Sequence, residues 1–226
     1  MLDRLASLLR LKEGEQEREF WEWFAANEAR YRVFVPGGPE RDALFAELTR
    51  RLGRVRRGVR FAFDAPDQTD SDDGGAQREL VLSADGNRDL FPAVRRLADA
   101  APPPDALPGW KVVAFRPRVR DLAGVALLLG ETVIGADDLW LALKPRGDRI
   151  DLDLYLRGLL EASEREIQKA CLLLLDYALG EYDVGTKVGA LDIHALPEDP
   201  AGSGLIPYPR LPEEFDARFA LQHETR

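Results

Sequence analysis

Residues 150–157 read IDLDLYLR, so that aliphatic side chains at every second position alternate with polar or aromatic ones. This period of two is typical of a β-strand with one buried face and one face toward water, which puts Asp151 and Asp153 on the wet face. The stretch that follows, 162–179, has its apolar residues at helical spacing. Gly180 then stands where a glycine in a left-handed conformation commonly ends a helix. Together these residues predict a strand followed by a helix that packs on its apolar face.

The same order of elements is predicted in both halves of the chain. The patterns indicate further strands at 59–64, 78–83, 110–116, 139–144 and 188–194, and helices at 40–52 and 87–101. We therefore predict an α+β fold of two similar strand–strand–helix–strand units. Each is expected to be a small, mostly antiparallel sheet with helices packed on one face, and an N-terminal helix precedes them. The expected boundaries are 1–38 for the N-terminal helical segment, 39–118 and 119–196 for the two units, and 197–226 for a Pro-rich C-terminal tail.

Both terminal segments carry aromatic residues that favour docking. A helix is predicted over 2–31, and it contains the aromatic string FWEWF at 20–24. Rings three or four positions apart share one helix face, and a cluster of this size is costly to leave in water. We expect the chain's own body to cover it. The tail is interpreted as an ordered wrap or a loose end, in which Phe215 and Phe219 favour some docking.

The composition narrows the class of protein. The 226 residues include 31 Lys and Arg against 40 Asp and Glu, a net charge of −9 that argues against nucleic-acid binding. No run approaches the roughly 20 apolar residues of a membrane-spanning helix, and the first residues lack the pattern of a signal peptide. The single cysteine, Cys171, fits a reducing compartment, and its place on the apolar stripe of the 162–179 helix predicts a buried packing residue. We therefore expect a soluble, cytoplasmic protein that binds neither nucleic acid nor membrane.

The sequence GEYD at 180–183 is the first candidate site. Two carboxylates separated by one residue point the same way in an extended segment, so Glu181 and Asp183 would lie together. Asp192 and His194 follow at alternate positions of the next predicted strand. The four side chains together would suit a hard divalent cation better than zinc. In this interpretation Glu181, Asp183 and His194 are the candidate catalytic residues of a metal-dependent hydrolase.

The alternative is that the same stretch holds the fold together. Tyr182 is then buried, and Glu181 or Asp183 accepts hydrogen bonds from nearby backbone, from Lys187 or from Arg116. The sequence has no ligand-dense metal motif, glycine-rich phosphate loop or nucleophile–base pair. We therefore expect no bound metal or cofactor, and we favour a protein without enzymatic activity.

A second candidate is the phrase Ser83-Ala84-Asp85-Gly86 at the end of a predicted strand. A hydroxyl and a carboxylate at a strand end are suggestive of a site. Asp-Gly is also among the commonest turn dipeptides, and no histidine lies nearby in the sequence to act as a base for Ser83. We favour a turn.

Several strings of the chain together carry a resemblance to a known family. They are FWEWF at 20–24, ELVLSADG at 79–86, WKVVAFRP at 110–117 and GEYD at 180–183. Their combination resembles an uncharacterised family of bacterial proteins, a domain of unknown function with an aromatic N-terminus and a Gly-Glu-Tyr-Asp signature. The resemblance implies a bacterial source and no mechanism. It marks as signature positions Asp85, Arg116, Glu181, Tyr182 and Asp183.

Two functions follow from these observations. We favour a non-enzymatic binding or regulatory protein that acts through protein–protein contacts with another, basic protein, because charge complementarity selects partners and speeds association. An immunity-like role against a basic effector is one form of it. The candidate binding residues are Asp85, Arg116, Tyr182 and Lys187. The alternative is the metal-dependent hydrolase, which clustering of the carboxylates around Glu181 within metal-ligand distance would favour.

Overall fold

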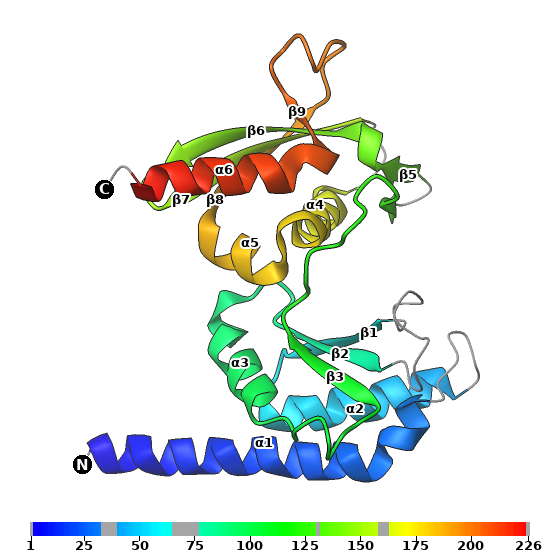
Figure 1. The fold of residues 1–226 in the computed structure, drawn as a ribbon, viewed down its shortest axis with the longest axis vertical. Coiled ribbons are helices and arrows are strands. Elements are labelled where there is room, and N and C mark those ends of the chain that lie inside the picture. The colour runs from blue at the N-terminus through cyan, green and yellow to red at the C-terminus, as the bar shows by residue number, and fades with distance from the viewer. Residues whose placement is uncertain (1, 33–39, 65–76, 130–131, 158–162, 225–226) are drawn as a thin grey trace. The chain divides into compact units, whose positions relative to one another are not determined.

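The chain forms two compact units, Met1–Phe115 and Arg116–Arg226, each with its own hydrophobic core. A computed structural model describes residues 2–32, 40–64, 77–129, 132–157 and 163–224 (Figure 1). The N-terminal helix belongs to the first unit, and the C-terminal tail belongs to the second.

Unit 1 is a three-stranded sheet with helices. Its elements are α1 (Leu2–Arg32), α2 (Arg41–Val55), β1 (Arg60–Asp64), β2 (Arg78–Ser83), the 3-10 turn η1 (Arg88–Leu90), α3 (Phe91–Asp99) and β3 (Trp110–Ala114). The strand order is β1-β2-β3, with β1 antiparallel and β3 parallel to β2.

Unit 2 repeats this arrangement and adds to it. Its elements are β4 (Ala126–Leu129), β5 (Thr132–Gly135), η2 (Ala136–Asp138), β6 (Leu139–Arg146), β7 (Arg149–Leu156), α4 (Glu164–Leu179), α5 (Glu181–Lys187), β8 (Val188–Ala195), β9 (Ile206–Pro207), η4 (Tyr208–Arg210) and α6 (Leu211–Glu224). The main sheet has the order β8-β7-β6-β9, and β4 and β5 form a separate hairpin.

The two units share one topology, which confirms the predicted α+β fold with an N-terminal helix. In each unit an antiparallel hairpin is followed by a helix, and the chain then returns as a strand parallel to the second strand. A parallel pair needs such a crossover connection, since a tight turn can join only antiparallel strands. The third strand of each repeat therefore lies beside the second and not beside the first.

The aromatic string of α1 packs into the core of unit 1, as expected. Trp21 and Phe24 are fully buried against residues of α3 and β3. The indole Nε1 of Trp21 donates to the backbone oxygen of Leu97 at 2.8 Å, so the polar edge of a buried ring is satisfied. The ring of Trp23 is half-buried, with the guanidinium of Arg51 4.8 Å from its centroid.

The core of unit 2 lies between one face of its sheet and the helices α4 and α6 (Figure 1). The alternate aliphatic residues of β7 are buried there, together with Cys171 of α4, whose thiol pKa burial raises to about 11. The tail is an integral part of this core and not a loose end. Tyr208 and Phe215 are buried, and the hydroxyl of Tyr208 donates to the backbone oxygen of Leu174 at 2.7 Å.

Candidate functional site

The Gly180–Asp183 stretch begins a helix, so the expectation of an extended segment is wrong. Gly180 ends α4 with φ +80° and ψ 141°, and α5 starts at the next residue. The positive φ agrees with the predicted role of glycine, but the ψ value is extended and not left-handed helical. In a helix, successive residues are rotated by about 100°, so side chains two apart point in different directions. Glu181 and Asp183 therefore enter different surroundings.

Glu181 is 1% exposed and is held by the backbone of the residue that opens unit 2. Its Oε2 accepts from the N–H of Arg116 at 3.1 Å, and its own N–H donates to the oxygen of Arg116 at 3.0 Å. The guanidinium of Arg116 donates to the buried carboxylate of Asp176 at 2.9 Å. A buried carboxylate is costly unless hydrogen bonds replace its water, and these contacts supply such bonds.

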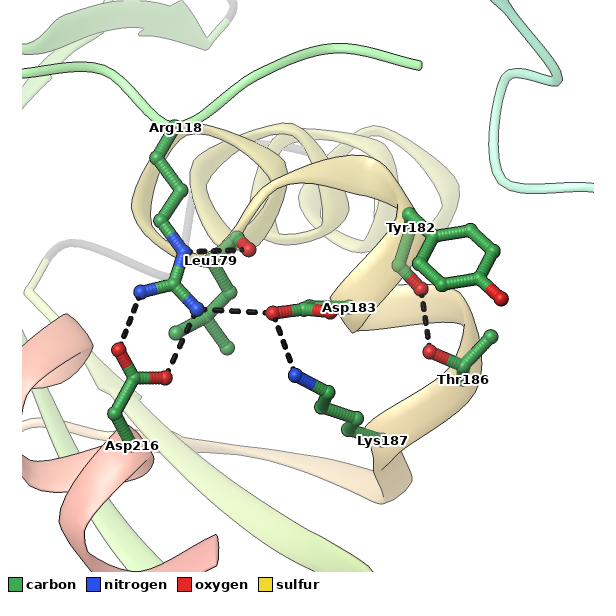
Figure 2. A network of polar contacts seen from close by, with 7 residues as sticks. All are labelled: Arg118, Leu179, Tyr182, Asp183, Thr186, Lys187 and Asp216. Carbon is green, nitrogen blue, oxygen red and sulfur yellow. Dashed lines mark hydrogen bonds and ion pairs between the residues drawn. The ribbon is translucent and has the colours of Figure 1, made fainter. Parts of the chain in front are cut away.

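Asp183 belongs to a second network, centred on Arg118 (Figure 2). Its Oδ2 accepts from Nη2 of Arg118 and from Nζ of Lys187, both at 2.9 Å. Arg118 also makes a two-pronged contact with Asp216 of α6, at 2.6 and 2.9 Å, and its Nε donates to the oxygen of Leu179 at 2.9 Å. The hydrogen bonds from Arg118 lower the pKa of Asp216. One guanidinium thus ties together the end of α4, the start of α5 and α6.

Tyr182 points away from these networks, and the expectation that it is buried is wrong. Its side chain is 38% exposed, while its backbone oxygen accepts from the hydroxyl of Thr186 at 2.7 Å (Figure 2). The helical register gives the buried position to Glu181 instead. Lys187 does reach Asp183 as expected, and its Nζ lies 5.0 Å from the ring centroid of Phe219.

The expected cluster of Glu181, Asp183, Asp192 and His194 does not form. The first two residues lie on α5 in the networks just described, and the other two lie on β8 beside β7. Within the described part of the chain, no three His, Cys, Asp or Glu side chains are grouped so that they could hold a metal ion. The geometry therefore gives Glu181 and Asp183 structural partners, and the four described side chains share no common centre.

Asp85 is a turn residue of unit 1, as the Asp-Gly dipeptide predicts. Its φ is +52°, and its N–H donates to the hydroxyl of Ser83 at 2.9 Å. Asn87 then caps η1 by accepting from the N–H of Asp89 at 3.1 Å.

A groove of about 640 Å³ lies in unit 2 between α4 and β8, and no pattern in the sequence indicates it. Its lining residues are Glu164, Ile167, Gln168, Leu172, Leu191, Asp192 and Ile193. Leu172 is a large apolar residue that is nevertheless 43% exposed. Among the described residues, β8 pairs with β7 alone and forms one edge of the main sheet. The strand itself was predicted from its sequence, but its edge position depends on the crossover topology.

The face of this sheet opposite the core carries two rows of side chains across the strands. One row joins Trp140, Tyr155 and His194, and the rings of the last two lie 5.0 Å apart at 30°. The next row joins Asp153 and Asp192. These rows end on β8, where Asp192 and His194 are exposed.

Asp153 is only 5% exposed, so the expectation of two solvated carboxylates on β7 is wrong for this residue. It forms an ion pair with Lys144 of β6, and His194 Nε2 lies 3.9 Å from its Oδ1. Asp151, on the same face, accepts from the N–H of Ala190 at 2.7 Å, and this bond lowers its pKa. Neighbouring strands cover both carboxylates, which an alternating pattern within one strand does not reveal.

Negative charge is concentrated in unit 2. Residues 116–226 contain 13 Lys and Arg against 20 Asp and Glu, a net charge of −7, whereas residues 1–115 carry −2. The groove and the two rows thus belong to the acidic half of the chain.

Comparison with known proteins adds no relative from which a role could be taken. No family model matches the chain, and no curated protein or solved structure is significantly similar to it. The resemblance to an uncharacterised bacterial family therefore stays a prediction. No helix in the described ranges combines the length and the apolar character needed to cross a bilayer.

Proposed function

We propose that the protein is a non-enzymatic binding protein, and that unit 2 takes up an extended segment of a basic partner protein as an additional strand beside β8. The observation that carries this proposal is the edge strand β8 with an apolar groove along it. An edge strand presents backbone N–H and C=O groups without strand partners, and an incoming strand can pair with them. The groove supplies pockets for the side chains of that strand.

The edge at β8 is suited to this role by its length and its surroundings. It has eight residues, whereas β9 at the other edge of the sheet has two. Proteins commonly protect long edges with lysines, prolines or covering elements. Residues 188–195 contain neither lysine nor proline, and Leu172 is exposed beside them. Leu172 lines the groove together with Leu191 and Ile193, and apolar side chains grouped at such an edge favour an interaction site.

Charge selects the partner. Unit 2 carries −7, and Glu164 and Asp192 stand in the lining of the groove. A second copy of the chain would bring the same negative charge to the same edge, and like charges destabilise such pairing. A basic segment is instead attracted by the negative charge of unit 2. This attraction speeds association and favours basic partners over others. The partner is therefore a basic protein. We propose that the protein has a regulatory or immunity-like role in a reducing compartment such as the cytoplasm.

The test uses fluorescence anisotropy of the full chain with a labelled peptide of about seven residues in which lysine alternates with valine. We expect binding that weakens with added salt and that is lost when the peptide amides on one edge are N-methylated, because methylation removes the donors that pair with β8. Leu172→Ala, which removes apolar contact without changing the charge, should weaken binding by about tenfold, since burial of a leucine contributes about 1.5–3 kcal/mol. Leu221→Ala is the matched control, because Leu221 is an exposed leucine on α6 and does not line the groove.

Three results would contradict the proposal. They are absence of binding, binding that N-methylation leaves unchanged, and equal effects of the two leucine variants. Sedimentation of the chain alone adds a further check. A dimer that Leu172→Ala dissociates would assign the groove to a second copy.

A further inference from the structure

The geometry points to a sequence pattern in the partner: basic residues at alternate positions, with aliphatic residues between them, and arginine favoured at the position beside His194. This inference rests on the proposed strand addition at β8. It follows from the two different environments on the two faces of that strand.

The core-side face of β8 is apolar. Leu191 and Ile193 pair in register with Leu152 and Leu154 of β7 and pack partly against the core. A strand added beside β8 would continue this face, because side chains in register lie on the same side of a sheet. Its residues on this side would meet the groove, where Leu172 is exposed. Aliphatic side chains are the ones that gain by burial there.

The opposite face of β8 is acidic and aromatic. Asp192 is exposed, and the charge of Lys144 reaches it, although the ammonium of Lys144 forms its ion pair with Asp153. Its neighbour Asp153 is already paired with Lys144. A lysine or arginine beside Asp192 would therefore complete a cross-strand pair, whereas a carboxylate there would be repelled.

The residue of the added strand that lies beside His194 is expected to be arginine and not lysine. Trp140, Tyr155 and His194 form a row across three strands, with the rings of Tyr155 and His194 near parallel at 30°. A planar guanidinium stacks on such a ring, and the ammonium of lysine does so less well. Since 192 and 194 are two residues apart, both basic positions of the added strand fall on one face, with an aliphatic residue between them.

Alternation is essential to this pattern. A shift of one residue moves every side chain of a strand to the other face, so a peptide with its basic and aliphatic residues in separate blocks cannot match both faces of β8. Net charge alone, by contrast, would not distinguish an alternating peptide from a block peptide of the same composition.

The experiment compares labelled peptides of identical composition in the anisotropy assay. One alternates arginine or lysine with valine, and the other has the valines first and the basic residues last. We expect the alternating peptide to bind at least about tenfold more tightly. We also expect Asp192→Asn to weaken its binding about two- to fivefold, the range of an exposed ion pair. Asp137→Asn removes the same charge from η2, outside the groove lining, and should leave the affinity unchanged.

The outcomes separate this inference from the proposed function. Equal binding of the two peptides, with N-methylation still weakening both, would overturn the pattern and leave strand addition intact. Equal effects of Asp192→Asn and Asp137→Asn would overturn the role of Asp192. Peptide binding that N-methylation does not weaken would overturn strand addition itself.

Discussion

Glu181 and Arg116 exchange two hydrogen bonds, from the N–H of each residue to an oxygen of the other, at 3.0 and 3.1 Å. The side chain of Glu181 and the backbone of Arg116 are 65 positions apart in the sequence, and the carboxylate is buried. This contact explains why a glutamate stands at the first position of α5. It fixes the junction of α4 and α5 to the non-strand segment that opens unit 2 at Arg116.

Removal of this contact should destabilise the protein. Glu181→Ala leaves the N–H of Arg116 without its carboxylate acceptor, and we expect a loss of about 1–3 kcal/mol in the free energy of unfolding. Glu181→Gln keeps a side-chain oxygen and should lose less. Urea denaturation measures both. Glu22→Ala is the control, because Glu22 lies in an exposed ion pair on α1, and a loss as large there would contradict the assignment.

Gly180 should not tolerate a side chain, for conformational reasons. A Cβ there would lie 3.5 Å from the oxygen of Arg116, which is an ordinary contact, but the φ of +80° is strained for any other residue. We expect Gly180→Ala to cost about 1–3 kcal/mol in thermal or urea unfolding, because residues other than glycine rarely combine a positive φ with an extended ψ. Gly14→Ala on α1, where nothing lies within 4 Å of the added Cβ, should instead stabilise the helix by about 0.5–1 kcal/mol. The same sign for both substitutions would refute this explanation.

The contact of Arg118 with Asp216 predicts a pH dependence. The hydrogen bonds lower the pKa of Asp216 in the folded state, so its contribution to stability is present above the unfolded value of about 3.9 and is lost as the pH falls through the folded value. The difference in stability between the wild type and Asp216→Asn should therefore be largest near neutral pH and should shrink steadily as the pH falls below the unfolded pKa of about 3.9. Urea denaturation across this range measures it. A difference that grows toward acid would contradict the contact.

Asp183 distinguishes a structural from a metal-binding role most simply. Asp183→Asn weakens charge-assisted bonds to Arg118 and Lys187, and we expect a loss of about 1 kcal/mol. Thermal melts with chelator and with Mg²⁺, Mn²⁺ or Ca²⁺ should show no ion-dependent rise in the wild-type melting temperature. A rise that the Asn variant abolishes would support a metal site, since a ligand that binds the folded state raises its stability.

Patterns local to one element were sufficient to predict most strands and helices. The alternation at 150–156 and the helical spacing at 162–179 led to β7 and α4, and the repeated order led to the two units. Such patterns work because burial of one face imposes a period on the sequence.

Features that depend on distant partners were not predictable. The seven residues of α5 include Gly185 and Thr186, which are weak helix formers, and its helical form is accompanied by contacts with Arg116 and Arg118. In the tail, two prolines close to the start of α6 obscured the helix. The groove and the free edge were also missed, because no pattern within β8 indicates which strand lies beside it. The binding site that we propose is therefore a property of the topology.

Amide hydrogen exchange of the full chain, followed by NMR, tests the central claim most directly. It is measured with and without the alternating basic peptide at saturating concentration. If the peptide adds as a strand, the amides of β8 that do not donate to β7 should exchange at least about tenfold more slowly, and the amide of Ile206 in β9 at the opposite edge should be unchanged. Protection confined to other elements, or bound peptide without protection of β8, would contradict the account.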